Sequence, residues 1–161
     1  MTWNVPLVIA SAAFVLFLAW KLRPHMDEEQ GAAGKRAALR AAKQRAATAK
    51  SDEERALALA DAGDAAAGGI RGGDSAVGYY LRAMRSDPKS SELVARAAKG
   101  LARRPRALES LLWRRLGAEP WKGGSEEAAR AALAELSRLY AGPLRNAARA
   151  RAMEHAKALL G

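Results

Sequence analysis

The chain has 161 residues, carries a formal net charge of +10 and contains no cysteine. Without cysteine it can form no disulfide bond, and it has neither a thiolate nucleophile nor a thiolate metal ligand. Alanine is abundant and β-branched residues are scarce beyond residue 25, so we predict an all-α fold. We expect three parts: a membrane anchor at residues 1–24, a basic stalk at 25–50 and a helical domain at 51–161.

The first part centres on an uncharged apolar run, VPLVIASAAFVLFLAW, at residues 5–20. A helix over residues 3–22 would be roughly 30 Å long, which matches the hydrocarbon core of a bilayer. Tryptophan at both ends favours the two headgroup layers. The run therefore predicts a transmembrane helix. The aromatic residues that we assign to this anchor are Trp3, Phe14, Phe17 and Trp20.

Two other interpretations of the run are a signal peptide that is removed and an interfacial or buried helix. No basic residue precedes the run, whereas a signal peptide usually has such residues there. Eight basic and three acidic residues follow it between positions 21 and 50. Because positive charge beside a membrane segment stays in the cytoplasm, we expect the N-terminus outside and the C-terminal domain in the cytosol, at a bacterial inner membrane.

The predicted stalk alternates alanine with lysine and arginine between residues 27 and 50, and Leu39 is its only large apolar side chain. Such a segment is helical by propensity but has little apolar surface to bury. We expect either a solvated stalk whose basic residues fix the topology or a helix that lies on anionic lipid headgroups.

Six amphipathic segments follow, separated by short turns that contain glycine or proline. Ser51 with Glu54 forms a capping box at the start of the first, and Pro105 suits the first turn of the fourth. In the sixth we expect Leu144, Ala148, Ala152, Ala156 and Leu159 to share the inward face. The first predicted helix runs from Ser51 to about Gly68. The second is capped by Asp74 or Ser75 and ends at Pro88, and the third starts at Ser90 or Ser91 and includes Leu101. The remaining three lie at about 105–116, 125–140 and 144–159.

These helices pair into three hairpins that recur at intervals of roughly 34 to 36 residues, which is typical of a helical solenoid. Residues Ala76, Tyr80, Ala83 and Pro88 have the spacing of the second helix of a tetratricopeptide repeat (TPR), and the last hairpin is similar through Leu136 and Tyr140. The chain between residues 51 and 160 thus resembles a TPR protein. It departs from the pattern at Ala60, where a large aromatic is usual, and at Arg149, where a small residue is usual. An ordinary antiparallel helical bundle would show the same apolar stripes.

The sequence offers little for catalysis. His155 has no partner at metal-ligand spacing, and His25 lies beside the predicted membrane exit. The stretch GGIRGGD, residues 68–74, lacks the lysine and hydroxyl residue of a phosphate-binding loop and indicates a turn. We therefore expect no enzyme activity, no cofactor and no metal site.

Arginines cluster around the turn between the third and fourth predicted helices, with tryptophans nearby. Arginine and tryptophan are enriched where proteins dock, although a solvated charged turn gives the same pattern. Tyr79 is expected at the surface if Tyr80 fills the core. The candidate protein-binding residues are Tyr79, Arg103, Arg104, Arg106, Trp113, Arg114, Arg115 and Trp121.

The resemblance implies an adaptor or scaffold that binds protein partners, acidic or membrane-embedded, from the cytoplasmic face. Membrane-anchored TPR proteins of bacterial inner membranes share this layout. The alternative is a small structural or assembly subunit of a membrane complex that contacts its partners through the transmembrane helix, whose small residues permit close packing. Anionic lipid is a further candidate partner for the stalk. Nucleic acid is not expected, because no nucleic-acid-binding signature accompanies the arginines.

Overall fold

The computed structural model describes residues 14, 17, 33–69, 72–118 and 124–160. The chain divides into two compact units, Met1–Gly34 and Lys35–Gly161. The predicted anchor therefore lies outside the described residues, apart from Phe14 and Phe17, which are helical and 61% and 49% exposed.

Among the residues that the structure describes, no helix combines the length and the apolar character that a membrane crossing requires.

The described part of the chain is helical and contains no strand, which confirms the all-α prediction. Residues 33–48 are helical, and each of the six predicted helices beyond residue 50 has a counterpart. These are α2 (Asp52–Ala67), α3 (Gly73–Ser86), α4 (Ser91–Gly100), α5 (Pro105–Leu116), α6 (Glu126–Ala141) and α7 (Ala147–Ala158).

Local capping explains where several helices begin. Ser51 Oγ accepts a hydrogen bond from the amide of Glu54 (3.1 Å), and Glu54 Oε2 accepts one from the amide of Lys50 (2.9 Å). Ser90 caps α4 in the same way, and Pro105 occupies the first turn of α5. α7 begins later than predicted, because Asn146 rather than residue 144 caps it through the amide of Arg149.

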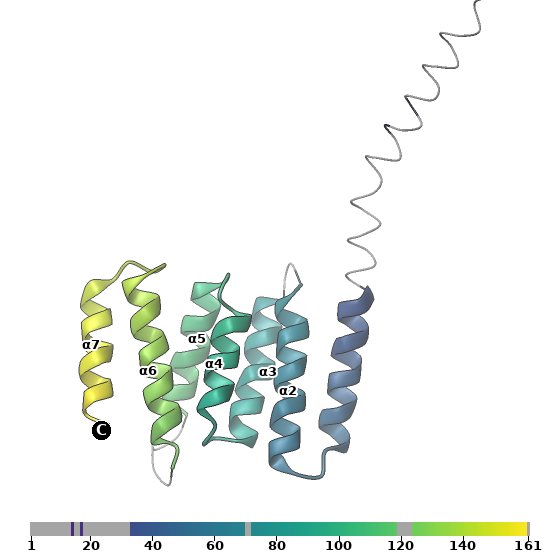
Figure 1. The fold of residues 1–161 in the computed structure, drawn as a ribbon, viewed down its shortest axis with the longest axis horizontal. Coiled ribbons are helices and arrows are strands. Elements are labelled where there is room, and N and C mark those ends of the chain that lie inside the picture. The colour runs from purple at the N-terminus through teal and green to yellow at the C-terminus, as the bar shows by residue number, and fades with distance from the viewer. Residues whose placement is uncertain (1–13, 15–16, 18–32, 70–71, 119–123, 161) are drawn as a thin grey trace, which may run out of the picture. The chain divides into compact units, whose positions relative to one another are not determined.

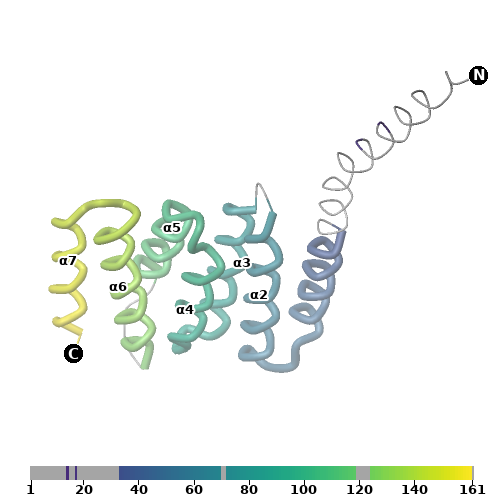
Figure 2. The backbone as a smooth tube through the Cα atoms, turned by 45° about the horizontal axis from the view of Figure 1, so that its top comes forward, coloured from purple at the N-terminus to yellow at the C-terminus, as the bar shows by residue number. Residues whose placement is uncertain are grey.

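The unit Lys35–Gly161 is built from hairpins arranged in two layers. α2 packs against α3 and α6 against α7, and α4 lies between α2 and α6. In Figure 1, α2, α4 and α6 form the layer nearer the viewer, and α3 and α5 lie behind them. Figure 2 shows the same arrangement after a 45° turn. The two layers enclose a core of leucine, alanine and tyrosine side chains that includes Val94, Leu111, Leu136 and Tyr140.

Small residues set the distance between the first helices. The ring of Tyr80 packs directly on Gly63 of α2, where a methyl group would lie 2.8 Å from its Cε1 atom, and its hydroxyl approaches Gly100 of α4. Ala60, Ala76 and Ala83 are fully buried in the same core cluster. The alanine at position 60, which departs from the repeat pattern, is therefore a core residue.

Segment 35–48 belongs to the same compact unit as α2 to α7, whereas the stalk was predicted to end only at residue 50. Ala42 is 1% exposed, and Leu39 is half-buried against the core. Lys35 Nζ donates to the carbonyl of Gly68 (2.9 Å), and Arg45 pairs with Asp61 (2.9 Å). Residues 35–48 thus contact the helical domain through a few side chains, although most of them are exposed.

The inward face predicted for the last helix is wrong in part, because of its five residues only Leu144, which packs against the core, and Ala156 are half-buried. Ala150 is the buried residue of α7, whereas Ala148 and Ala152 are exposed and Leu159 is 87% exposed. Among the described helices, α7 packs mainly on α6 and reaches α5 only through Arg149, so a narrow stripe of its surface is covered. Because α7 has alanine on several of its sides, its sequence pattern does not identify the side that is buried.

We predict that Gly63→Ala lowers the free energy of unfolding by about 1 kcal/mol or more, because overpacking against Tyr80 outweighs the gain in helix propensity. Gly78→Ala in α3 is the matched control: nothing lies within 4 Å of the added methyl group, so it should stabilise by up to about 1 kcal/mol. Urea unfolding followed by circular dichroism measures both. Equal effects of the two substitutions would contradict the close contact.

We also predict that Ala42→Glu undocks segment 35–48, because burying a charged carboxylate at this position costs free energy. Amide hydrogen exchange across residues 36–48 should accelerate by about tenfold or more. Ala41→Glu introduces the same charge at an exposed neighbouring position and should leave exchange close to that of the unmodified chain. Slow exchange in both variants would show that the segment is held independently of this contact.

Candidate functional site

A hollow of about 1000 Å³ lies between the C-terminal half of α2 and the length of α4. Alanine and glycine line its floor, and charged side chains surround it. The turn after α4 closes one end with Arg103, which is exposed, and Arg104, which is half-buried and donates to the carbonyl of Gly69. The charged residues that line the hollow are Asp64, Glu92, Arg96, Lys99, Arg103 and Arg104.

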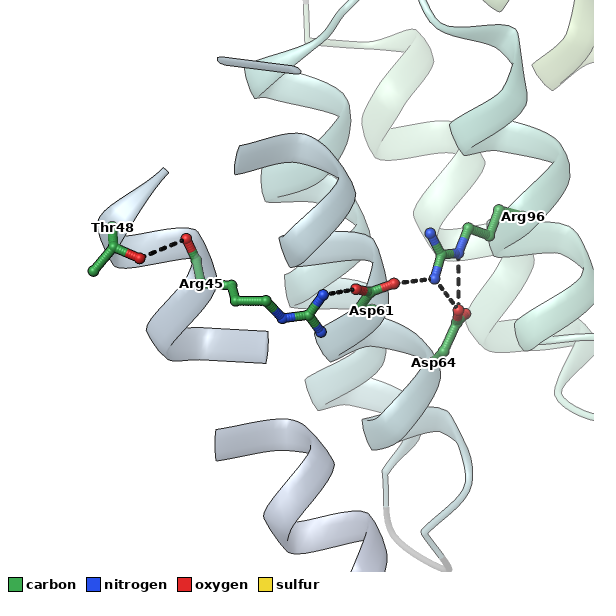
Figure 3. Close-up of polar contacts among 5 residues, drawn as sticks. All are labelled: Arg45, Thr48, Asp61, Asp64 and Arg96. Atoms are coloured by element: carbon green, nitrogen blue, oxygen red, sulfur yellow. Dashed lines mark hydrogen bonds and ion pairs between the residues drawn. The ribbon is translucent and has the colours of Figure 1, made fainter. Parts of the chain in front are cut away.

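An ion-pair network includes two residues that line this hollow, Asp64 and Arg96 (Figure 3). Arg96 of α4 binds Asp64 through Nε (2.8 Å) and a terminal nitrogen (2.6 Å), and it also binds Asp61. Asp61 in turn accepts from Arg45 (2.9 Å). Burial lowers the pKa of Arg96, but its hydrogen bonds to Asp61 and Asp64 outweigh this effect and raise the pKa overall. The network therefore ties segment 35–48, α2 and α4 together and pairs Asp61 and Asp64 of α2 with arginines.

Tyr80 joins the network from the other layer. Its ring is 1% exposed, and its hydroxyl donates to Asp64. Burial, followed by the hydrogen bond to Asp64 and the charge of that carboxylate, raises the pKa of Tyr80 well above its ordinary value of 10.0. Asp64 thus accepts hydrogen bonds from Tyr80 of α3 and Arg96 of α4, and these bonds hold the wall of the hollow in place.

The arginines grouped by the sequence are distributed over three different environments. Arg103 and Arg104 line the hollow between α2 and α4. Arg106 and Arg114 line a smaller hollow of about 290 Å³ between α3 and α5, on the other layer. Arg115 is 2% exposed and donates to the carbonyl of Pro88 (2.8 Å), so the expectation that it is available to a partner is wrong.

Tyr79 is 8% exposed, which corrects the expectation that it lies free at the surface. The guanidinium of Arg82 lies 4.6 Å from the ring centroid, and the ammonium of Lys43 lies 5.6 Å from it. Segment 35–48 covers this part of α3, so both tyrosines of the pair are buried.

A second polar cluster surrounds Tyr140. Its hydroxyl donates to Glu109 Oε1 (2.6 Å) and accepts from the indole nitrogen of Trp113 (3.0 Å). Arg149 lies over the ring and within 3.5 Å of Glu109. The arginine that departs from the repeat pattern therefore has a structural partner in this cluster. Trp113 is 44% exposed, and Trp121 lies outside the described residues.

The repeat residues chosen from the sequence do form the core: Ala76, Tyr80, Ala83, Leu136 and Tyr140 are at most 1% exposed, and Pro88 is half-buried. Sequence reasoning missed Asp61, Asp64 and Arg96. A signal for the first two exists, because they are acids spaced three apart within an alanine-rich helix. Arg96 carried no comparable signal, since its partners lie more than 30 positions away.

Within the described ranges, no group of three or more histidine, cysteine, aspartate or glutamate residues could hold a metal ion. The expectation of no catalysis stays a prediction. Comparisons of the chain with protein-family models, with curated proteins and with solved structures found no match.

We predict that the stability of the protein falls as the pH rises above about 10, because unfolded chains release the tyrosine proton there while folded Tyr80 retains it. At pH 7, Tyr80→Phe should lower the free energy of unfolding by about 0.5–1.5 kcal/mol through loss of the hydrogen bond to Asp64. This difference should narrow above pH 10, since phenylalanine has no proton to lose. A constant difference across that range, measured by urea unfolding, would contradict the raised pKa of Tyr80.

Proposed function

We propose that this chain is a TPR-like adaptor, anchored by its N-terminal helix at the cytoplasmic face of a bacterial inner membrane, that binds an acidic segment of a protein partner. The layered hairpins support this proposal, because α2, α4 and α6 lie side by side as alternate helices of a solenoid do. Stacked hairpins of this kind present extended surfaces to partners.

The hollow between α2 and α4 is the observation that carries the proposal. Four basic side chains line it, against the two carboxylates of Asp64 and Glu92, and Asp64 is already paired with Arg96. Lys99 and Arg103 are exposed at its rim. An acidic peptide segment is complementary to this arrangement, and long-range attraction would speed its encounter with the hollow.

We predict that Lys99→Glu combined with Arg103→Glu weakens capture of the partner about tenfold or more, because attraction at the rim becomes repulsion. The measurement is quantitative pull-down of the tagged full chain from native membranes, with each bound protein compared between variants. Arg130→Glu with Arg151→Glu makes the same change of charge at exposed positions outside the hollow and should leave capture unchanged. Undiminished capture after the rim reversal would refute binding in the hollow.

Replacing residues 5–20 by a polyleucine run separates the adaptor from the alternative, a subunit that contacts its complex through the membrane. An adaptor keeps its partner after this exchange, because the recognition surface lies in the unit Lys35–Gly161. A subunit recognised through its membrane helix loses the partner.

A further inference from the structure

The layer formed by α3 and α5, with the adjoining segment 35–48, exposes a row of five basic side chains and one tryptophan that the proposed function does not use. Its members lie on the outer faces of segment 35–48, α3 and α5, and all are exposed. We call this row the basic face. It consists of Lys43, Arg82, Arg85, Arg106, Trp113 and Arg114.

Contacts connect segment 35–48 and α5, which carry parts of the basic face, to α3 between them. Lys43 and Arg82 approach the same ring, that of Tyr79, which joins segment 35–48 to α3. Arg106 and Arg114 line one hollow together with Val77 of α3, which joins α3 to α5. Arg85 follows Arg82 by three residues and lies on the same side of α3.

Little negative charge opposes these cations. Asp74, at the N-terminal end of α3, lines the α3/α5 hollow. Glu109 of α5 is half-buried, and its carboxylate binds the hydroxyl of Tyr140 and lies near Arg149. The face therefore keeps five basic side chains against one exposed carboxylate, whereas the acids of α2 lie in the other layer.

We propose that the basic face docks on the surface of an anionic lipid bilayer. Each basic residue near such a surface is attracted to it, and the attraction accumulates over the five basic residues of this face. Trp113 adds a half-exposed indole whose nitrogen is held by Tyr140, and indole rings favour the headgroup layer. A bilayer fits better than nucleic acid because the charges spread over three helices without a groove-reading element.

Docking through this layer leaves the hollow between α2 and α4 facing away from the lipid.

The proposal does not depend on the adaptor function, because it rests on different residues. The predicted apolar run at residues 5–20 gives a separate reason to expect a bilayer close to this domain.

The absence of native cysteine allows a direct test by site-specific spin labelling of the full chain. Ser110→Cys places a label on the basic side of α5, and Ala95→Cys places a matched label at an exposed position of the other hollow. Both proteins are reconstituted in phosphatidylcholine vesicles with and without phosphatidylglycerol. We expect phosphatidylglycerol to reduce the access of a water-soluble nickel relaxant to position 110 by about threefold or more and to leave position 95 unchanged.

Two further measurements test whether the charges of the basic face cause the protection of position 110. Arg82→Glu, Arg106→Glu and Arg114→Glu together, at unchanged helical content, should restore access to position 110, and raised salt should do the same. Equal access at position 110 in both kinds of vesicle would overturn the proposal, as would protection of position 95 instead. Protection of position 110 by duplex DNA but not by anionic vesicles would assign the face to nucleic acid and would equally overturn it.

Discussion

The close approach of α2, α3 and α4 around Tyr80 is the constraint on which the rest of this domain depends. The ring lies against Gly63, so α2 and α3 can approach only because position 63 has no side chain. The hydroxyl of Tyr80 donates a hydrogen bond to Asp64, and Asp64 binds Arg96 of α4. A buried hydroxyl without such a partner would cost free energy, so the acid at position 64 makes an aromatic at position 80 compatible with a closely packed core. The same acid defines the wall of the α2/α4 hollow.

The two layers differ in charge, although the net charge of +10 does not show this difference. Asp61 and Asp64 of α2 pair with Arg45 and Arg96, so part of the positive charge is used in internal ion pairs. The cations of α3 and α5 have fewer acids beside them and stay exposed. One face therefore combines mixed charge with a hollow, and the other has an excess of positive charge. This asymmetry is the reason to assign the two faces to different kinds of partner.

Much of the fold could be predicted because the residues that begin and end its helices act locally. Ser51, Ser90 and Pro105 mark helix starts through bonds or backbone geometry within a few residues, and helices α2 to α7 begin and end near the expected positions. The site was less accessible to this reasoning. Neighbours in sequence such as Arg104, Arg106 and Arg115 point to different faces once a turn and a helix intervene, and Arg96 meets its acids across 32 and 35 positions. Alanine gave little information on which side of segment 35–48 or of α7 packs, since every side of these helices is rich in it.

Segment 35–48 shows why counting basic residues overstates the charge offered to a membrane. Three of its basic side chains contact the helical domain. Lys35 binds the Gly68 carbonyl, Arg45 binds Asp61, and Lys43 lies over Tyr79. Arg36 and Arg40 are exposed on the side of the helix away from Ala42. An ion pair such as Arg45 with Asp61 contributes no net charge at a distance, so the positive field of this segment is weaker than its composition suggests. Lys43 differs, because cation–π contact leaves its charge uncompensated and thereby extends the positive surface of α3 onto the segment.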